Sequence, residues 1–256
     1  MYIDTHCHLD DAKLRDDLQN TVKEFLSVGV ERVINIGCDL DSSVLVKNQA
    51  EKFDCVYFAA GFHPMDIDRY SVYAEEEISK LLAHEKCVAV GEIGLDYYWK
   101  KDNKEEQKKA FIRQIEIAYA NKLPINVHVR DAIGDALEIL KQNKSKLVYG
   151  GTMHCFSGSK EIAAEMLKIG MYISFGGTLT FKNARSALEV ASFVPDDMIL
   201  TETDSPYLAP EPYRGKRNSS LYLPQVVAAL AEIKGLTCQE IEDITWRNAC
   251  RFYGIE

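Results

Sequence analysis

The residues Tyr2-Ile-Asp-Thr-His-Cys-His-Leu-Asp10 form the stretch on which the prediction of this chain's fold depends. Side chains alternate between the two faces of a strand, so Asp4, His6 and His8 share one face of the strand expected here. Ile3 begins the apolar half on the other face. Two imidazoles two residues apart on one face can both bind a single metal ion. The alternative, a disordered polar terminus, is disfavoured by the apolar face and by the lack of a tag-like run.

Seven more short apolar segments follow this first strand, and segments with helical periodicity separate them. The strands are predicted at residues 2–10, 32–37, 54–61, 87–94, 124–130, 147–154, 171–175 and 198–204. The helices are predicted at residues 11–28, 42–51, 75–84, 104–121, 132–142, 160–169, 184–193, 222–234 and 239–252.

This alternation, without a linker or a break in composition, predicts an α/β fold with a parallel sheet. We expect a (β/α)8 TIM barrel that forms a single domain over residues 1–256. A doubly wound open sheet is the alternative, because alternation alone does not prove closure. The absence of a Gly-rich phosphate motif after the first strand disfavours that alternative.

Composition restricts the possible partners and the compartment. A net charge of −9 argues against broad electrostatic binding to nucleic acid or to an anionic membrane, although a local basic groove remains compatible with it. The seven cysteines are an odd number and include no Cys-x-x-Cys pair, which is typical of reduced thiols in the cytoplasm. We expect no signal peptide, no membrane association and no obligatory protein partner.

Candidate metal ligands stand at the carboxyl ends of five predicted strands, where barrel enzymes build their active sites. Four of the chain's six histidines belong to this set. Such a concentration is not expected of polar residues that only confer solubility. The candidates are His6, His8, Glu92, His128, His154 and Asp204.

Six protein ligands are too many for one catalytic metal that keeps an open position, but they suit two metals that share a carboxylate. The first and last strands become neighbours when a barrel closes, so His6, His8 and Asp204 are predicted to hold one metal. The fifth and sixth strands are also neighbours, and their two histidines are predicted to hold the other. Glu92 lies between the two groups in barrel order and is the expected bridge.

Six ordered motifs of this chain together resemble those of the TatD family of metal-dependent hydrolases. They are Asp4-Thr-His-Cys-His-Leu-Asp10, Gly61-Phe-His-Pro64, Gly91-Glu-Ile-Gly-Leu-Asp-Tyr-Tyr98, His128-Val-Arg-Asp-Ala132, His154-Cys-Phe-Ser-Gly158 and Glu202-Thr-Asp-Ser-Pro-Tyr-Leu208. The resemblance implies an amidohydrolase-like TIM barrel, the same six metal ligands, and a deoxyribonuclease that degrades DNA in a 3'-5' exonuclease-like manner. The chain departs from the family where Ser219-Ser220 replaces the usual Glu-Pro.

Hydrolysis of a phosphodiester bond needs an activated water and neutralisation of charge on the phosphoryl oxygens, and two divalent metal ions supply both. Asp204 is expected either to orient and deprotonate that water or to act only as a ligand. Glu202 is expected to accept a hydrogen bond from a ligand histidine and so orient it. Four imidazoles favour Zn, Mn, Co or Fe over Mg, which prefers oxygen ligands. The family resemblance points to Mg, so Mg, Mn and Zn are kept as the main candidates.

Two further candidates for catalysis each have a structural alternative. Arg130 is expected to clamp a phosphate oxygen, or else to form a salt bridge with a carboxylate such as Asp131. His63 is expected to stabilise the leaving oxygen or bind substrate, or else to pack beside Pro64 in a turn.

Two loops are candidates for contact with a nucleic acid substrate. Arg214, Lys216 and Arg217 form a compact basic loop in an otherwise acidic chain. The aromatic residues 97–99, which follow Glu92, are able in principle to stack on bases, but packing is the more frequent use of aromatic residues in a barrel loop and is favoured here.

Two enzyme functions are compatible with these residues. The first is a two-metal deoxyribonuclease that acts on single-stranded DNA from an end. The second is a metal-dependent ester hydrolase, such as a D-aminoacyl-tRNA deacylase, which needs the same activated water. A binding protein without catalysis is disfavoured because so many ligands have no structural purpose in a closed core.

Overall fold

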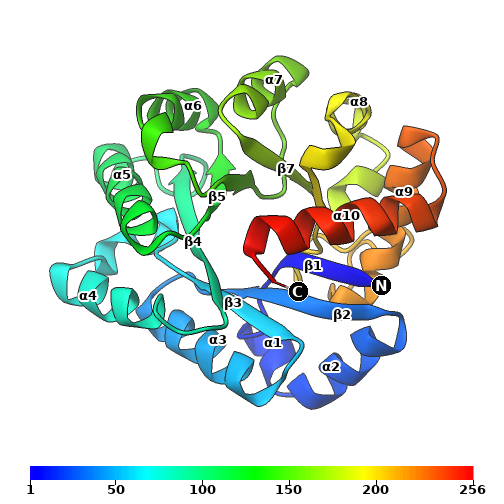
Figure 1. Ribbon diagram of the computed structural model, residues 1–256, viewed down its shortest axis with the longest axis horizontal. Helices are drawn as coiled ribbons and strands as arrows, with labels where there is room; N and C mark the ends of the chain where they lie inside the picture. The colour runs from blue at the N-terminus through cyan, green and yellow to red at the C-terminus, as the bar shows by residue number, and fades with distance from the viewer. Residues whose placement is uncertain (256) are drawn as a thin grey trace. The chain divides into compact units, whose positions relative to one another are not determined.

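The computed structural model describes residues 1–255 and contains all eight predicted strands, which alternate with helices (Figure 1). The strands are β1 (Tyr2–Cys7), β2 (Val30–Ile36), β3 (Val56–Ala60), β4 (Cys87–Asp96), β5 (Ile125–Arg130), β6 (Gly151–Met153), β7 (Met171–Phe175) and β8 (Ile199–Thr201).

The helices also follow the predicted order, with short 3-10 segments between them. The α-helices are α1 (Ala12–Arg15), α2 (Leu18–Ser27), α3 (Leu40–Lys52), α4 (Val72–Leu81), α5 (Lys104–Asn121), α6 (Ile133–Gln142), α7 (Lys160–Lys168), α8 (Arg185–Phe193), α9 (Leu223–Lys234) and α10 (Cys238–Tyr253). The 3-10 segments are η1 (Pro64–Arg69), η2 (Lys144–Lys146), η3 (Gly177–Thr180), η4 (Asp196–Met198) and η5 (Ser220–Tyr222).

Some predicted boundaries are wrong, and local backbone geometry explains them. The helix expected over residues 11–28 is divided into α1 and α2, because Asp17 has a φ of −126°, outside the helical region. The sixth strand begins only at Gly151, since Gly150 before it adopts a positive φ of 90°. The eighth strand ends at Thr201, and Asp204, expected at its end, lies in the following turn with a φ of 54°.

Strand order confirms the topology of the predicted barrel. The eight strands follow one another in the sheet in chain order, and every pair with a defined register runs parallel. A parallel bridge between Cys7 and Ser205 places the end of the last strand beside the end of the first. The doubly wound alternative would need a reversal of strand order, which is not observed.

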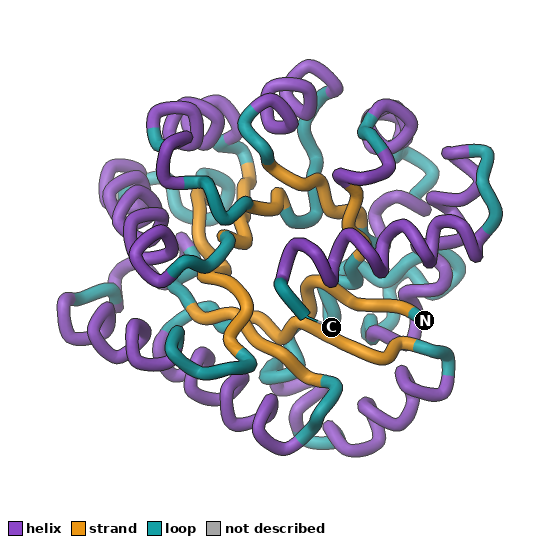
Figure 2. Tube along the Cα trace, viewed as in Figure 1, coloured by secondary structure: helices purple, strands orange, loops and turns teal. Residues whose placement is uncertain are grey.

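The described chain divides into two compact units. Unit 1 comprises Met1–Asn35, Cys155–Ala164 and the chain from Ile173 onward, and unit 2 comprises Ile36–His154 and Glu165–Tyr172. In unit 1, α10 packs against β1 and β8. In unit 2, α5 packs against β4 and α3 against β3, and Figure 2 shows these helices (purple) beside the strands (orange). The single-domain organisation expected from the sequence stays a prediction.

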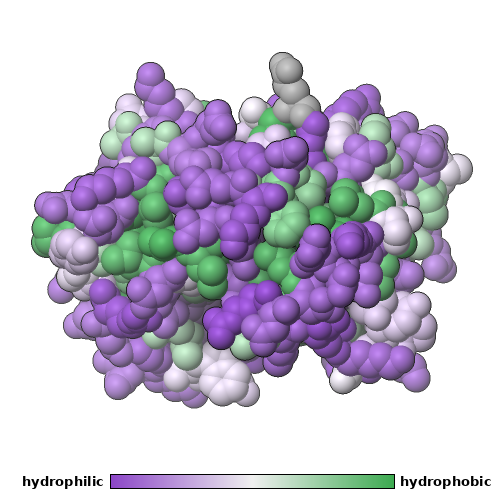
Figure 3. Space-filling model, turned by 90° about the horizontal axis from the view of Figure 1, so that it is seen from below, coloured by the Kyte–Doolittle hydropathy of each residue, from purple (hydrophilic) through white to green (hydrophobic). Residues whose placement is uncertain are grey.

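Each unit has its own apolar core, built from the strands and the helices beside them. In unit 2, Phe58 of β3, Leu95 of β4 and Phe111 of α5 are fully buried. In unit 1, Phe25 of α2 and Leu230 of α9 are fully buried. The face drawn in Figure 3 is mostly hydrophilic, with hydrophobic residues in patches between the polar ones.

Among the helices within residues 1–255, none combines the length and the apolar character needed to cross a membrane.

A substitution at Gly94 of β4 tests how closely this strand approaches β5. This glycine has a φ of +141°, and a Cβ atom added to it would lie 2.0 Å from the carbonyl oxygen of His128. We expect Gly94→Ala to lower the free energy of unfolding by at least about 2 kcal/mol, because both the φ angle and the contact oppose a side chain. Chemical denaturation monitored by circular dichroism measures this.

Gly134 of α6 provides the matched control, because a Cβ added there meets no atom within 4 Å. Gly134→Ala should leave stability unchanged or raise it by up to about 1 kcal/mol, since alanine favours helix. Equal unfolding free energies for the two variants would contradict the role assigned to Gly94.

Candidate metal centre

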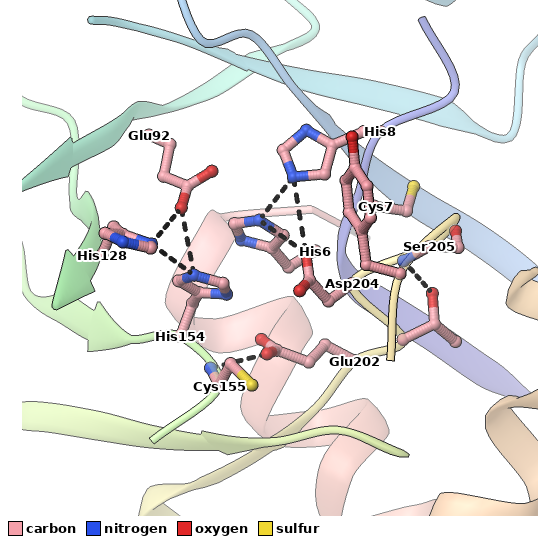
Figure 4. A network of polar contacts seen from close by, with 12 residues as sticks. His6, Cys7, His8, Glu92, His128, His154, Cys155, Glu202, Asp204 and Ser205 are labelled. Carbon is pink, nitrogen blue, oxygen red and sulfur yellow. Dashed lines mark hydrogen bonds and ion pairs between the residues drawn. The ribbon is translucent and has the colours of Figure 1, made fainter. Parts of the chain in front are cut away.

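The first cluster of candidate ligands lies in unit 1 and consists of His6, His8 and Asp204 (Figure 4). The Nε2 atoms of the two imidazoles are 3.2 Å apart. Asp204 Oδ1 lies 3.8 Å from Nε2 of His6 and 3.5 Å from Nε2 of His8. The side chain of His6 is fully buried, whereas those of His8 and Asp204 are 11% and 13% exposed. Two imidazole nitrogens and one carboxylate oxygen thus converge, as in sites for divalent transition metals.

Backbone hydrogen bonds bring these three residues together. The amide of His8 donates to the carbonyl of Ser205 over 2.7 Å, and the amide of Asp204 donates to the carbonyl of His6 over 2.9 Å. The first strand was expected to continue to residue 10, but β1 ends at Cys7, so His6 lies in β1 and His8 directly follows it. The turn after β8 then places Asp204 beside them.

Asp4 ties β1 to the chain that follows β8. Its Oδ1 accepts hydrogen bonds from the amides of Thr203 (2.9 Å) and His6 (3.3 Å), and its Oδ2 accepts one from the hydroxyl of Thr203 (2.5 Å). Complete burial raises the pKa of Asp4 to about 7 despite these bonds. The carboxyl group therefore fixes the backbone on both sides of the first cluster.

Glu202 is fully buried in unit 1 and has two short hydrogen bonds. Its Oε1 accepts from the amide of Cys155 at 2.6 Å, and its Oε2 accepts from the hydroxyl of Ser174 at 2.5 Å. A carboxylate oxygen of Glu202 also lies within 4.8 Å of a ring nitrogen of His6. The expected hydrogen bond from a ligand histidine stays a prediction, and the contacts with Cys155 and Ser174 were not expected from the sequence.

The second cluster lies in unit 2 and is arranged around Glu92 (Figure 4). Its Oε1 lies 2.9 Å from His128 Nδ1, 3.0 Å from His154 Nε2 and 3.7 Å from His63 Nε2. The rings of His128 and His154 are stacked, with their facing nitrogens 3.3 Å apart. Three ring nitrogens thus surround one buried carboxylate oxygen, and His63, Glu92 and His128 have the spacing of a possible metal site.

Asp96 supports this second cluster, and sequence reasoning missed it. Its Oδ2 lies 3.1 Å from Nε2 of His128, on the opposite side of the ring from Glu92. Its Oδ1 accepts hydrogen bonds from the amides of Tyr98 and Trp99, both at 2.9 Å. The fourth strand was expected to end at residue 94. It continues to Asp96, which shares the face of Glu92 because the two are four residues apart.

The pair of Asp96 and His128 is electrostatically favourable. Burial alone would lower the pKa of His128, but hydrogen bonds to the carboxylates of Asp96 and Glu92 outweigh it and raise that pKa. Burial alone would raise the pKa of Asp96, but His128 and the two backbone amides lower it. An ionised Asp96 therefore orients the His128 ring so that Nδ1 faces Glu92, as carboxylates do behind metal-binding histidines.

His63 lies in the turn beside Pro64, as one of its two alternatives expected, and its role toward substrate stays a prediction. Its Nδ1 accepts a hydrogen bond from the amide of Met65 at 3.1 Å, so the side chain caps the η1 segment that begins with Pro64. Its Nε2 faces Glu92, and its ring centroid lies 4.4 Å from that of His128. The turn thus holds the ring against the second cluster.

Arg130 is exposed at the end of β5 and stacks on aromatic rings. Its guanidinium carbon lies 4.0 Å from the centroid of the Tyr98 ring and 5.4 Å from that of Trp99. The N–H groups around the rim of the guanidinium can still donate to a phosphate.

The basic loop lies in unit 1, and its three cations are exposed. Arg214 stacks on Phe181 with 4.2 Å between the guanidinium carbon and the ring centroid, and Arg217 donates to the carbonyl of Lys13. The departure from the family pattern is buried: Ser219 accepts a hydrogen bond from the amide of Leu221 at the start of η5. Ser219 therefore has a local structural role.

Comparisons with known proteins agree with this geometry. A model of the family described as TatD related DNase matches residues 3–254. YabD, a metal-dependent hydrolase of Bacillus subtilis, is 43% identical, and the match covers 100% of both chains. YcfH, a metal-dependent hydrolase of Escherichia coli, is 36% identical over 99% of this chain and 96% of its own. The crystal structure of YJJV, a TatD homologue from Escherichia coli, has a TM-score of 0.95 at 28% identity, covering 100% of this chain and 98% of that one. The predicted fold is therefore confirmed.

Asp96→Asn tests the support of the second cluster. The amide keeps the size of the side chain but removes the charge behind His128, so we expect metal affinity at this cluster to fall about 10- to 100-fold. Titration of Zn or Mn into metal-free protein by calorimetry measures the affinity.

Asp68→Asn is the matched control, because Asp68 is an exposed carboxylate of the same unit, paired with Lys100. Its metal affinity should equal that of the unsubstituted protein. If Asp96→Asn binds metal equally well, Asp96 does not support the cluster.

Proposed function

Since this chain belongs to the TatD-related DNase family and is a metal-dependent hydrolase, we propose that it hydrolyses phosphodiester bonds of DNA. The preferred substrate is single-stranded DNA, degraded from one end with 3'-5' polarity. The observation that carries the proposal is the pair of clusters in which imidazole nitrogens converge on a carboxylate oxygen. The family description supports the choice of DNA.

The donor atoms of both clusters fit divalent metal ions. We assign one ion to His6, His8 and Asp204, and a second ion to Glu92, His128 and His154. In the second cluster, ring nitrogens of His128 and His154 lie 2.9 and 3.0 Å from the Glu92 oxygen. Groups at these distances share either a proton or a metal ion. The bridging role of Glu92 stays a prediction. Imidazole-rich donors favour Zn or Mn, and Mg stays a candidate.

When bound, two such ions supply an activated water and neutralise charge that develops on the phosphoryl oxygens. The carboxylate of Asp204 lies beside both imidazoles of its cluster and is suited to orient this water and accept its proton. Arg130 contributes N–H donors for a phosphate oxygen from the end of β5. His63 is held by its turn with Nε2 toward Glu92, in a position to donate to the leaving oxygen.

The cytoplasm is the proposed compartment. All seven cysteines have free thiols, which supports a reducing environment.

Cleavage of end-labelled, single-stranded DNA by metal-stripped protein, with Mg, Mn or Zn added back, tests this function. We expect a ladder from the 3' end that appears only with metal. Glu92→Ala should lower the rate by at least about a hundredfold, because the second cluster loses its central carboxylate.

Glu76→Ala is the control, because Glu76 is an exposed glutamate on α4 of the same unit. It should cleave DNA at the unsubstituted rate. A protein that binds two ions per chain and leaves DNA intact would refute the nuclease proposal. Hydrolysis of D-aminoacyl-tRNA would then identify the ester-hydrolase alternative.

A further inference from the structure

Tyr98, Trp99 and Arg130 form an exposed stack in unit 2, which we term the stacking platform. Trp99 is 62% exposed and Tyr98 is 46% exposed. The two rings meet edge to face, with centroids 4.8 Å apart and an interplanar angle of 89°. Arg130 lies over the Tyr98 ring, so Tyr98 contacts both other members.

Packing explains the neighbouring aromatic residue but not these two. Tyr97 is only 8% exposed, and its hydroxyl donates to Asp135 over 2.8 Å. The sequence-based preference for packing is therefore correct for Tyr97. The preference for packing is wrong for Trp99, because most of this residue is exposed to water. It therefore lacks most of the stabilisation that burial gives a large aromatic side chain.

The side chain of Asp96 connects the stacking platform to the second cluster. Asp96 accepts hydrogen bonds from the amides of Tyr98 and Trp99, and its other oxygen contacts His128. The backbone that carries the two rings is thus fixed relative to a candidate metal ligand. A ligand bound on the platform has a defined position relative to His128.

The charge and shape of the platform select a ligand. A flat aromatic face suits another π-system, and every nucleobase has one. A guanidinium suits a phosphate, which it contacts through two N–H groups. This cation is local in a chain whose net charge is −9, so the attraction for an anion is confined to a small area.

We propose that the stacking platform binds one unpaired nucleotide of a single-stranded nucleic acid, with its base on Trp99 and its phosphate on Arg130. Tyr98 is the positioning residue, because it contacts both. The proposal rests on the proposed nuclease function and extends it, since the platform selects strands with accessible bases. A base paired within a duplex cannot offer its face to Trp99, so duplex DNA binds less well.

Binding is measured by the fluorescence anisotropy of a labelled single strand of about 12 nucleotides, within the usual range of site sizes. The protein is the full chain in metal-stripped form, so that the strand stays intact, since cleavage is expected only with added metal. Trp99→Ala and Tyr98→Ala are each expected to weaken binding about tenfold, a typical loss for one base stack. Trp99→Phe and Tyr98→Phe keep a ring and should bind within about twofold of the parent.

Tyr119→Ala is the matched control, because Tyr119 of α5 belongs to the same unit and is also 46% exposed. It should bind like the parent. An oligonucleotide of abasic sites separates base from phosphate recognition: Trp99→Ala should not weaken its binding, whereas Arg130→Ala should weaken it about tenfold. Arg130→Lys should restore part of that loss, because the charge remains.

The platform is refuted if Trp99→Ala binds the base-containing strand like the parent, or if it weakens binding of the abasic strand equally. The KM for cleavage by otherwise unsubstituted protein is a second readout, which should rise about tenfold in Trp99→Ala at unchanged kcat. Cleavage with normal KM by both Trp99→Ala and Tyr98→Ala would refute the platform and leave the nuclease proposal intact. Base-dependent binding without any cleavage would support the platform and refute the nuclease proposal.

Discussion

Two backbone hydrogen bonds join the ends of the first and last strands, and the arrangement of unit 1 depends on them. The amide of His8 donates to Ser205, and the amide of Asp204 donates to His6. The bonds make β8 the neighbour of β1, which completes the order of the sheet. They also bring Asp204 within 4 Å of two imidazoles from the opposite end of the chain. The same two hydrogen bonds therefore join the strand ends and bring the first cluster together.

Buried carboxylates position the ligands of both clusters. Asp4, Glu202 and Asp96 are almost completely inaccessible to water, and each accepts at least two hydrogen bonds. An unpaired carboxylate in such a place would be strongly destabilising, whereas these partners compensate for the lost hydration. The donors are backbone amides and hydroxyls, and those of Thr203 and Cys155 belong to residues next to candidate ligands. The strands place the candidate ligands close together, and the buried carboxylates then hold the neighbouring backbone and side chains in fixed positions.

The sequence alone predicted the order of strands and helices and the residues of both clusters, because apolar periodicity and the ends of parallel strands are local, repetitive signals. It did not predict Asp96, since strand pairing with β5 extends β4 beyond the apolar segment that defined it. The contacts of Glu202 with Cys155 and Ser174 were also missed, because they join three separate segments. Pairing across the sheet is decided by tertiary structure, which periodicity does not report.

The two contacts of Asp96 have a consequence for the thermodynamics of metal and ligand binding. One oxygen faces His128 and the other holds the turn that carries Tyr98 and Trp99. A metal that fixes His128 limits the positions open to Asp96 and hence to the turn, so part of the ordering needed for a ligand on the turn has already occurred. Linkage then requires the reverse effect of equal size, with the ligand strengthening the hold on the metal. Metal occupancy of such a site would depend on substrate concentration as well as on the supply of metal.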